Sequence, residues 1–512
     1  MTHPPITQSP TPPLHQPVDW LRSRAAVTPE RPALYFRGEV LRYGELDQQV
    51  EGLAASLWQA GVRPGTRVAA LLANSPAYVA LIHGLARLGA VLVPLNTRLV
   101  AHELTWQLTL TGADFLVSED QLATVAAAAA PPGCRRLDAH TLVAQTAPAG
   151  ERPWQQGTPL DQVQAIIFTS GTSGRPKGAM LTFGNHFWSA TASLYRLGLR
   201  EDDRWLSCLP LYHVGGLAVV FRCCLYGIPL VLHDHFEVDA FRASLEADGV
   251  TLTSLVPTML HRLLNRPGEG GPRGGLPASL RLILLGGAAA SAELLARCRD
   301  EGIPVATTYG LTEAASQVAT QRPGDTLRKP GSVGRPLMFT RVQVVDEEGK
   351  VLPPGEPGEI RVQGPTVMAG YYQDPEATAR ALRDGWLHTG DIGYLDGDGD
   401  LWLLQRRSDV IVSGGENVYP AEVEAALRQH PAVEEACVVG IPDPEWGQRV
   451  AAMVQLRPGH RVTVAELDAF LRPRLAGYKR PRILTFVESL PQTASGKIAR
   501  RTVAEMLQRP GQ

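Results

Sequence analysis

A loop rich in hydroxyl groups and glycine is the stretch of this 512-residue chain best suited to chemistry. Residues 169–178 read TSGTSGRPKG and follow an apolar run at 165–168, which predicts a buried parallel strand. Glycines let backbone N–H groups approach an anion, the hydroxyls add donors, and Lys177 adds a positive charge. The alternative, a flexible linker, does not ordinarily follow a buried strand directly. No Gly-Lys-Ser/Thr sequence closes the loop, so it predicts a polyphosphate site that is not a Walker A motif.

Three further polar clusters lie downstream, and each is weak evidence on its own. Residues 307–313 follow a predicted strand, where open α/β sheets bind ligands, with Tyr309 suited to stacking on a base and Glu313 to holding Mg²⁺. Residues 386–391 put a carboxylate after a glycine turn, which suits two ribose hydroxyls. Residues 491–497 place one lysine on a glycine-containing loop. The competing interpretations are, in order, an ordinary turn with a helix cap, a surface turn and a surface lysine.

The bulk composition argues against several functional classes. A chain of 512 residues is too long for one core, so we expect two or more domains. A net charge of −2 and a pI near 6.7 do not favour binding to nucleic acid or to an anionic membrane. No apolar run reaches the roughly 18 residues of a membrane span, and residues 1–17 lack the apolar stretch of a secretion signal and predict a disordered tail. Scattered cysteines without a CxxC pair predict reduced thiols in a cytoplasmic protein: Cys134, Cys208, Cys223, Cys224, Cys298 and Cys437.

The elements that must position these clusters follow an α/β pattern. An apolar face over residues 46–57 predicts a helix that ends near Gly61, a favourable residue beyond a helix C-terminus. Residues 68–72, 76–88 and 90–94 read as strand, helix and strand, a βαβ unit that implies a parallel sheet. Further strands are predicted at residues 205–209, 230–232, 251–256, 280–285 and 304–307.

The pattern changes in the last third of the chain. Short β runs with Gly/Pro turns begin near residue 342, and a compact α+β pattern follows residues 406–409. There, Pro420 favours the first turn of a helix and residues 463–466 form a capping box. About 100 residues suffice for a separate domain. We therefore expect a tail over residues 1–17, a large domain over 18–407 and a small domain over 408–512.

Taken together, the polar clusters resemble the adenylate-forming acyl-CoA synthetase superfamily. The matching segments are residues 169–178, 309–313, 386–391, 406–422 and 495–497, and the resemblance runs from about residue 20 to 507. It implies an α/β fold with a large N-terminal domain of packed sheets flanked by helices and a small mobile C-terminal α+β domain. It also implies two half-reactions, in which a carboxylate attacks the α-phosphate of MgATP and the thiol of coenzyme A then attacks the acyl-AMP.

The resemblance implies roles for single residues in the first half-reaction. Attack of one anion on another is slow unless charge is neutralised and the partners are aligned. Lys497 would stabilise the developing charge, Glu313 would carry Mg²⁺, and Thr312 would lie near the α-phosphate. The residues implied to bind ATP are Thr169, Ser170, Gly171, Thr172, Ser173, Gly174 and Lys177 at the β- and γ-phosphates, Gly287, Ala288, Ala289 and Tyr309 at the adenine, and Asp391 and Arg406 at the ribose.

The second half-reaction depends, by the same resemblance, on rotation of the small domain about a hinge at Ser408. Many relatives carry Asp or Lys at that position, and Gln405 stands where glycine usually precedes the arginine, so the geometry of rotation is left open. Gly414 and Gly415 would then face the pantetheine tunnel. Tyr478, Arg480 and Arg482 match positions that meet the nucleotide of coenzyme A in some relatives, and a solvated basic surface is the alternative.

The acyl pocket is expected around residues 211–216, residues 257–259 and the segment after Glu313. The segments that look most like o-succinylbenzoate–CoA ligases of menaquinone biosynthesis are residues 209–213, 221–227, 256–259, 312–317 and 406–409. A buried polar group without a partner costs about 1–3 kcal/mol, so polar side chains there favour a keto-diacid over an alkyl chain. One member, a histidine at the pocket mouth, would gate the pocket, bind substrate or be purely structural. The candidate pocket residues are His213, Gly215, Thr258, Met259, Ser316 and Gln317.

Two other functions remain open at this point. The first is a fatty-acid or arylalkanoate CoA ligase on the same scaffold. The second, from a different class, is a non-catalytic AMP-binding protein, although binding alone would not require Lys497 beside Glu313, Asp391 and Arg406. The expected partners are small molecules, namely the acid, ATP and coenzyme A. A homodimer is a tendency of the family.

Overall fold

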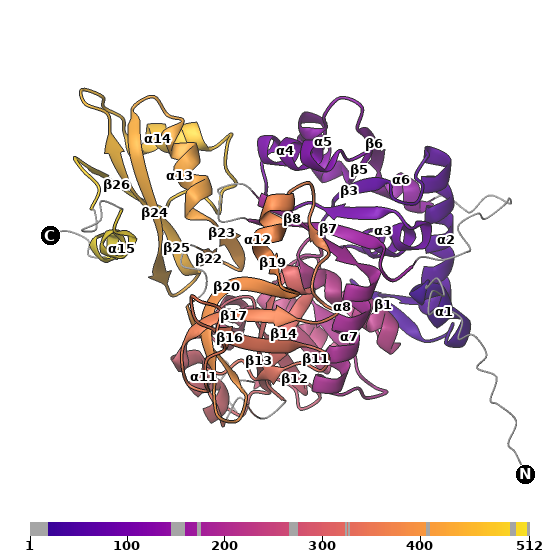
Figure 1. Ribbon diagram of the computed structural model, residues 1–512. Helices are drawn as coiled ribbons and strands as arrows, with labels where there is room; N and C mark the ends of the chain where they lie inside the picture. Colours follow the sequence, from indigo (N-terminus) through magenta and orange to yellow (C-terminus); the bar gives the residue numbers. More distant parts are fainter. Residues whose placement is uncertain are drawn as a thin grey trace, which may run out of the picture.

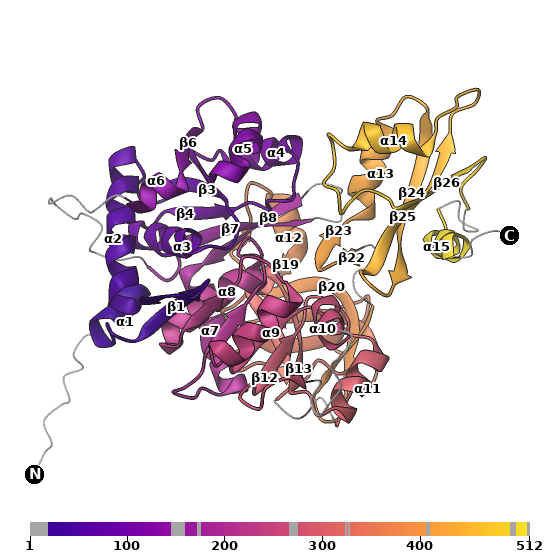
Figure 2. The ribbon, with the colours of Figure 1, turned by 180° about the vertical axis from the view of Figure 1, so that it is seen from behind.

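The computed structural model describes residues 19–144, 159–170, 176–265, 275–322, 325, 328–405, 410–491 and 498–508. The predicted N-terminal tail lies outside this range. The described chain forms a large body built from three sheets, with a smaller unit beside it that contains the C-terminal part of the chain (Figures 1 and 2).

A seven-stranded sheet borders the predicted polyphosphate loop. The predicted βαβ unit is confirmed, because β3 and β4 pair in parallel on either side of helix α3. Strand β7 pairs in parallel with β4 but antiparallel with β8, so the prediction of a parallel strand is right for only one of its edges. The strands in spatial order are β18 (Gly370–Tyr371), β8 (Pro176–Thr182), β7 (Val163–Ser170), β4 (Val91–Pro94), β3 (Arg67–Leu71), β5 (Phe115–Ser118) and β6 (Arg135–Asp138), and α3 spans Pro76–Leu88.

A nine-stranded sheet carries the second predicted cluster. The strand predicted at 304–307 is longer than expected, so residues 307–311 lie within the strand, and only Thr312 and Glu313 follow it, in the 3-10 turn η3 (Thr312–Ala314). The strands in spatial order are β15 (Arg335–Pro336), β14 (Ser316–Thr320), β13 (Val305–Leu311), β12 (Leu282–Leu285), β11 (Leu252–Leu255), β9 (Trp205–Ser207), β10 (Leu230–Leu232), β1 (Pro32–Phe36) and β2 (Glu39–Arg42).

One apolar core joins these two sheets through helices α7 (Phe183–Leu197) and α8 (Val214–Tyr226). Leu92 and Ile167 come from the first sheet, and Leu230 comes from the second. The two helices therefore hold strands β7 and β8 and the 307–313 cluster in a common frame.

A five-stranded sheet follows in the chain and carries the third cluster. Residues 386–391 lie inside a ten-residue strand, so the predicted glycine turn is wrong. Gly390 nevertheless adopts a left-handed φ of 72°, which bends the strand just before Asp391. The strands are β16 (Arg341–Val345), β17 (Gly358–Gln363), β20 (Trp386–Leu395) and β19 (Leu382–Arg383), and β21 (Leu401–Gln405) pairs with β20.

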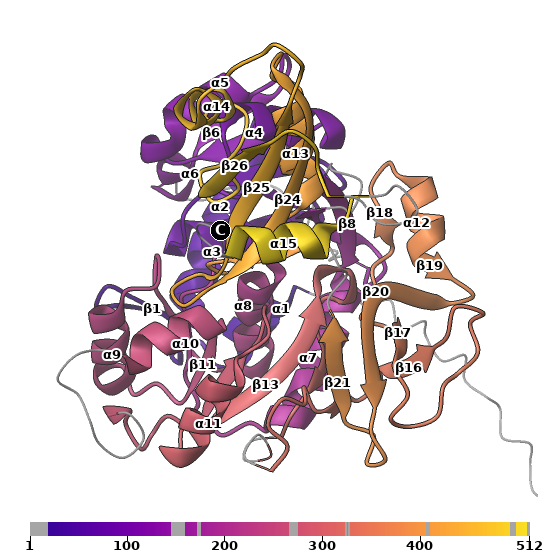
Figure 3. The ribbon, with the colours of Figure 1, turned by 90° about the vertical axis from the view of Figure 1, so that its left-hand side faces the viewer.

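The smaller unit contains its own five-stranded sheet and two apolar core clusters. Figure 3 shows its strands β24, β25 and β26 together with its helices. The predicted helix start at Pro420 is confirmed, and so is the capping box, in which Thr463 and Glu466 bond each other's backbone N–H groups. Its elements are β22 (Ile411–Ser413), β23 (Glu416–Val418), α13 (Pro420–Arg428), β24 (Val433–Asp443), β25 (Gly447–Leu456), α14 (Val464–Leu471), β26 (Ile483–Val487) and α15 (Arg500–Gln508).

The remaining helices cover the sheets of the large body. The helix predicted to end at Gly61 is confirmed, and this glycine has a left-handed φ of 106°. The described part of the chain contains no helix with the length and apolar character needed to cross a membrane. These helices are α1 (Trp20–Val27), α2 (Tyr43–Ala60), α4 (Ala101–Thr111), η1 (Asp120–Leu122), α5 (Ala123–Ala129), α6 (Ala139–Ala144), α9 (Val238–Ala247), α10 (Pro257–Leu264), α11 (Ala292–Asp300) and α12 (Pro375–Ala381).

Candidate active site

A carboxylate, two hydroxyls and an ammonium group from four elements lie together at the rim of the first sheet. Glu313 Oε1 accepts hydrogen bonds from Thr169 Oγ1 at 3.3 Å and from the Tyr371 hydroxyl at 2.8 Å. Lys177 Nζ lies 5.3 Å from the centre of the Tyr371 ring. Mg²⁺ beside phosphates is usually held by one or two carboxylates, so this donor set fits a metal–polyphosphate ligand. Thr312 occupies the same 3-10 turn as Glu313.

The two residues predicted to contact the nucleoside also meet. The Tyr309 hydroxyl on β13 donates a hydrogen bond to Asp391 Oδ2 on β20 at 2.5 Å, and both side chains are buried. The backbone N–H of Asp391 bonds Thr389 Oγ1 at 3.1 Å, which holds the bend at Gly390. The predicted adenine segment, Gly287, Ala288 and Ala289, forms the loop after β12.

The small unit seats a glycine hairpin on the predicted acyl pocket. A Cβ atom at Gly415 would lie 3.4 Å from Val256 Cγ2, and a Cβ atom at Gly447 would lie 3.6 Å from Thr258 Cγ2. Val256 also faces Gly287, where a Cβ atom would approach its Cγ1 to 3.1 Å. Gly287, predicted for adenine, and Gly415, predicted for pantetheine, therefore both lie against Val256, next to the predicted pocket residues 257–259.

Glu416 follows these glycines and is the main polar contact between the small unit and the large body. Its carboxylate bonds Asn96 Nδ2 at 3.1 Å, Arg98 Nη1 at 3.3 Å, the Tyr212 hydroxyl at 3.3 Å and His213 Nε2 at 3.1 Å. Burial by itself would raise the pKa of Glu416, but His213 and Arg98 outweigh it and lower this pKa to about 2. The sequence analysis missed Glu416, although a carboxylate directly after two glycines was a usable signal.

A second set of ion pairs joins the small unit to the large body. It lies near the residues predicted to bind the nucleotide part of coenzyme A. Lys479 Nζ lies 2.6 Å from Glu103 Oε1 of the large body and 2.8 Å from Glu422 Oε1 of the small unit. Its neighbour Tyr478 packs under Arg98, whose guanidinium lies 5.1 Å from the ring centre.

The two predicted arginines lie on the small unit itself. Arg480 pairs with Asp468, and Arg482 is exposed. The structure therefore brings Tyr478 to the interface with the large body and leaves Arg482 facing solvent.

Arg222 is a buried cation that the sequence analysis missed. It is 1% exposed on α8, its Nη2 donates to Ser189 Oγ at 3.3 Å, and its guanidinium lies 5.8 Å from the Trp205 ring centre. Among the described residues the ionisable neighbours that favour its charge are Tyr226 and Cys223 and no carboxylate, and its Nε has no hydrogen-bond partner there. An arginine inside the apolar run of residues 214–226 was a usable signal.

Arg222 connects to the segment after Glu313. Ser189 Oγ donates to the Ala315 carbonyl at 2.6 Å, and Ala315 and Ser316 have left-handed φ values of 50° and 98°. Gln317 is buried, and its Oε1 has no hydrogen-bond partner among the described residues. Such backbone conformations in non-glycine residues cost about 1–3 kcal/mol each and are common at active sites.

The remaining predicted residues divide into two groups. Gly215 lies in the first turn of α8, and Met259 packs against a separate core cluster of the nine-stranded sheet. Outside the described residues lie Gly171, Thr172, Ser173, Gly174, Arg406, Ser408 and Lys497, together with the side chains of Ser170 and Gln405.

Two family models match the chain. The model of the AMP-binding enzyme family matches residues 21–372, and that of the AMP-binding enzyme C-terminal domain matches residues 422–497. The 2-succinylbenzoate–CoA ligase of Geobacillus sp. (strain WCH70) is 42% identical over 494 residues, which cover 96% of this chain and 97% of that protein. The ligase of the same name from Geobacillus kaustophilus (strain HTA426) is 43% identical over 489 residues, covering 96% and 98%.

Solved structures from Bacillus subtilis are also similar. A double mutant of o-succinylbenzoate CoA synthetase bound with its product analogue OSB-NCoA is 40% identical, covers 96% of this chain and 99% of its own, and has a TM-score of 0.90. The complex of that synthetase with the acyl-adenylate intermediate OSB-AMP has the same identity, coverages of 96% and 98%, and a TM-score of 0.73. An amide bond synthetase from Marinactinospora thermotolerans is 31% identical, with a TM-score of 0.86 and coverages of 95% and 99%.

Proposed function

Since this chain belongs to the AMP-binding enzyme family, we propose that it joins o-succinylbenzoate to coenzyme A in two steps. A carboxylate oxygen of the acid bonds the α-phosphorus of ATP, and pyrophosphate leaves. The thiol sulfur of coenzyme A, after loss of its proton, then bonds the acyl carbon, and AMP leaves. The substrates are ATP, coenzyme A and the acid, and Mg²⁺ is the metal.

The residues around Tyr371 serve the first step. Thr169 and Lys177 bind the β- and γ-phosphates, together with the loop that they flank, and Glu313 would hold Mg²⁺, which neutralises phosphate charge when bound. The contacts of Glu313 with Thr169 and Tyr371 support this assignment. Binding the departing pyrophosphate in this way lowers the cost of separating it from the α-phosphorus.

The nucleoside of ATP binds across the contact between the second and third sheets. Asp391 and Arg406 hold the ribose, whereas Tyr309, Gly287, Ala288 and Ala289 line the adenine. The hydrogen bond from Tyr309 to Asp391 supports this assignment because it places an aromatic ring beside the carboxylate that would accept the ribose hydroxyls.

The second step uses the arrangement seen in this structure. We propose a domain boundary at residues 407–408, with a hinge at Ser408, and a thioester-forming arrangement in which Gly414 and Gly415 border the pantetheine tunnel. The closeness of Gly415 to Val256, whose Cγ2 would lie 3.4 Å from a Cβ atom at position 415, supports this. The higher TM-score for the complex with a CoA product analogue, 0.90 against 0.73 for the acyl-adenylate complex, supports it too.

Replacing Glu416 by glutamine is expected to slow the second step about tenfold and to leave the first unchanged. A hydrogen bond to a charged group contributes about 1.5–3 kcal/mol, and this carboxylate docks the small unit through four such partners. Rapid-quench measurement of pyrophosphate release, and then of AMP release after addition of coenzyme A, separates the two steps. The matched control is Glu434→Gln, an exposed carboxylate of the same unit. Equal slowing of both steps contradicts the assignment.

The low pKa of Glu416 sets the direction of a pH effect on docking. Docking lowers this pKa from 4.5 to about 2, so the charged contact contributes fully above pH 4.5 and is lost as pH falls toward 2. The glutamine variant should lack this dependence.

Replacing Arg480 by glutamate is expected to raise the KM for coenzyme A about five- to tenfold without changing that for ATP. The reason is that the new negative charge repels the phosphates of coenzyme A. Arg472→Glu is the matched control, because Arg472 pairs with the same Asp468 as Arg480 but is not assigned to the site. Unchanged dependence on coenzyme A contradicts a role for Arg480 in binding it.

The observation that favours a diacid as the substrate is the burial of Arg222 without a carboxylate partner among the described residues. A guanidinium stays charged in proteins, and burying it without an anion costs several kcal/mol. A substrate with a second carboxylate would supply that anion, while a fatty acid would leave the charge unpaired. The connection from Arg222 through Ser189 to Ala315 places it beside the segment assigned to the acyl pocket.

Pyrophosphate release with a panel of acids tests the proposal. Release with o-succinylbenzoate but not with octanoate, hexadecanoate or an arylalkanoate is the expected result. Efficient release with the monoacids favours the runner-up, a fatty-acid or arylalkanoate CoA ligase, and no release with any acid favours an AMP-binding protein without catalytic activity.

We also propose a cytoplasmic location and, from the tendency of the family, a homodimer. All six cysteines are free, which suits a reducing compartment. Light scattering of the purified protein measures its oligomeric state.

A further inference from the structure

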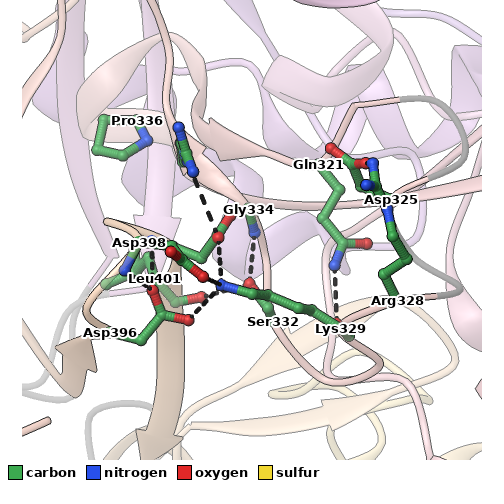
Figure 4. A network of polar contacts seen from close by, with 12 residues as sticks. Gln321, Asp325, Arg328, Lys329, Ser332, Gly334, Pro336, Asp396, Asp398 and Leu401 are labelled. Carbon is green, nitrogen blue, oxygen red and sulfur yellow. Dashed lines mark hydrogen bonds and ion pairs between the residues drawn. The ribbon is translucent and has the colours of Figure 1, made fainter.

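Lys329 holds the tip of the hairpin formed by β20 and β21. Its Nζ lies 2.8 Å from Asp396, 2.7 Å from Asp398 and 2.8 Å from Asp400, each measured to Oδ2 (Figure 4). These residues form the tip sequence Asp-Gly-Asp-Gly-Asp. The three carboxylates offer oxygens within 4.8 Å of one another, so without a cation they would repel and open the tip.

The tip is ordered around this ammonium group. Asp396 Oδ1 accepts the backbone N–H groups of Asp398 at 2.9 Å and Asp400 at 3.0 Å, and its Oδ2 accepts Trp402 Nε1 at 3.0 Å. The hydrogen bonds to the carboxylates raise the pKa of Lys329, so the group stays protonated at neutral pH.

The backbone around Lys329 is bound to the strand that carries Tyr309. The Lys329 carbonyl accepts Gln321 Nε2 at 2.9 Å (Figure 4). Thr307 Oγ1 on β13 lies 2.8 Å from Gln321 Oε1 and donates to the Ser332 carbonyl at 2.7 Å. Ser332 Oγ in turn donates to the Leu401 carbonyl of β21 at 3.2 Å.

The β20–β21 hairpin therefore contacts β13, or the segment bonded to β13, at two places. One is the bond between Tyr309 and Asp391, and the other is the tip held by Lys329. Asp396 lies five positions after Asp391, a distance of about 17 Å along an extended strand. Strand β20 is also paired with β17 and β21, so these two contacts fix how that hairpin lies against β13.

We propose that Lys329 is a positioning residue for nucleotide binding, which orients Asp391 by fixing the hairpin tip against the frame of β13. This inference rests on the proposed role of Asp391 toward the ribose. Lys329 itself does not touch the reacting atoms. It supplies, from the chain itself, the positive charge that a loop of alternating aspartates would otherwise take from a cation.

Lys329→Ala should raise the Kd for AMP about tenfold, within the range of roughly 2- to 30-fold expected for losses transmitted through packed networks. The KM values for the acid and coenzyme A should stay within twofold. Lys329→Arg should recover most of the affinity, because a guanidinium also bonds carboxylates. Lys350→Ala, an exposed lysine in another turn, is the matched control. Unchanged AMP binding in Lys329→Ala overturns the inference, and so does equal weakening of all three ligands.

A second measurement separates charge at the tip from general destabilisation. Lys329→Ala leaves three carboxylates within reach of one cation, next to the Trp402 indole. Tb³⁺ luminescence excited through tryptophan should therefore appear in this variant and not in the wild type, and Ca²⁺ should restore AMP binding measured without Mg²⁺. Cation binding that leaves the Kd for AMP elevated overturns the inference. If the variant gives no Tb³⁺ emission, the Kd values for AMP of the wild type and of Lys329→Ala decide.

The controls distinguish this inference from the proposed function. A wild type that releases no pyrophosphate with any acid refutes the function. A wild type that releases pyrophosphate and binds AMP, beside a Lys329→Ala variant that binds AMP equally well, refutes only the role of Lys329.

Discussion

Replacing Lys497 by alanine is expected to lower the rate of acyl-AMP formation by about 10³-fold and to leave conversion of preformed acyl-AMP to acyl-CoA largely intact. Removing one group that stabilises developing charge typically costs roughly 10²–10³-fold in rate. The ammonium group of Lys497 is assigned to the α-phosphate and the attacking carboxylate, where two anions must meet. The acyl-AMP that enters the second step already contains the bond that this lysine helps to form.

The measurement uses two assays on one enzyme preparation. Pyrophosphate release reports the first step, and acyl-CoA formation from synthetic acyl-AMP and coenzyme A reports the second, which serves as the internal control for folding. Equal loss of both activities would contradict the assignment of Lys497 to adenylation. Retention of both would place the adenylating cation elsewhere, and Lys177, beside Tyr371, would be the first candidate.

Local signals in the sequence account for the parts of the fold that were predicted. Helix α3 begins at Pro76 after the capping residue Ser75, whose side chain accepts the N–H of Tyr78, and it ends at the left-handed Gly89. These features depend on neighbouring residues, so a single sequence reveals them. The helix starting at Pro420 was predictable for the same reason.

Strand pairing was less predictable, because it joins residues far apart in the chain. Nothing near residues 386–391 indicates that β17 and β21 lie on either side of them, so a glycine within a strand read as a turn. The antiparallel partner of β7 was missed although it begins only a few residues later. A short apolar run does not reveal the direction of its neighbours.

The candidate site was predictable where its residues carry distinctive chemistry. Glu313 and Thr169 are 144 positions apart, yet both were identified and the structure joins them. Tyr371 was not identified, because a tyrosine is common on protein surfaces and only its tertiary contact with Glu313 gives it a role. Glu416 was missed although it directly follows two glycines, and its partners come from distant parts of the chain.

Replacing Arg222 by leucine is expected to lower kcat/KM for o-succinylbenzoate by about 10²–10³-fold. Truncating one partner of a buried charge pair costs roughly 2–5 kcal/mol, and each 1.4 kcal/mol corresponds to a factor of about ten. Steady-state pyrophosphate release with o-succinylbenzoate, and with monoacid analogues that each lack one carboxylate, measures the change. One analogue keeps the carboxylate that attacks ATP and lacks the other carboxylate. The activity of the variant with this analogue should be unchanged or improved. Arg222→Lys, which keeps the charge, should retain part of the activity with the diacid.

Stability distinguishes this role from a structural one. A buried cation without an anionic partner destabilises the free enzyme, and replacing buried ionic groups by apolar ones is often neutral or stabilising by about 1–4 kcal/mol. The surroundings suit a neutral replacement, since His186 beside Arg222 is kept uncharged by burial, which lowers its pKa to about 3. Arg222→Leu should therefore raise the melting temperature of the free enzyme while it abolishes stabilisation by the diacid. A leucine variant that melts at a lower temperature and loses activity with every acid equally would show instead that Arg222 supports the packing of α7 against α8. Arg222 would then not be the group that binds the second carboxylate of the diacid.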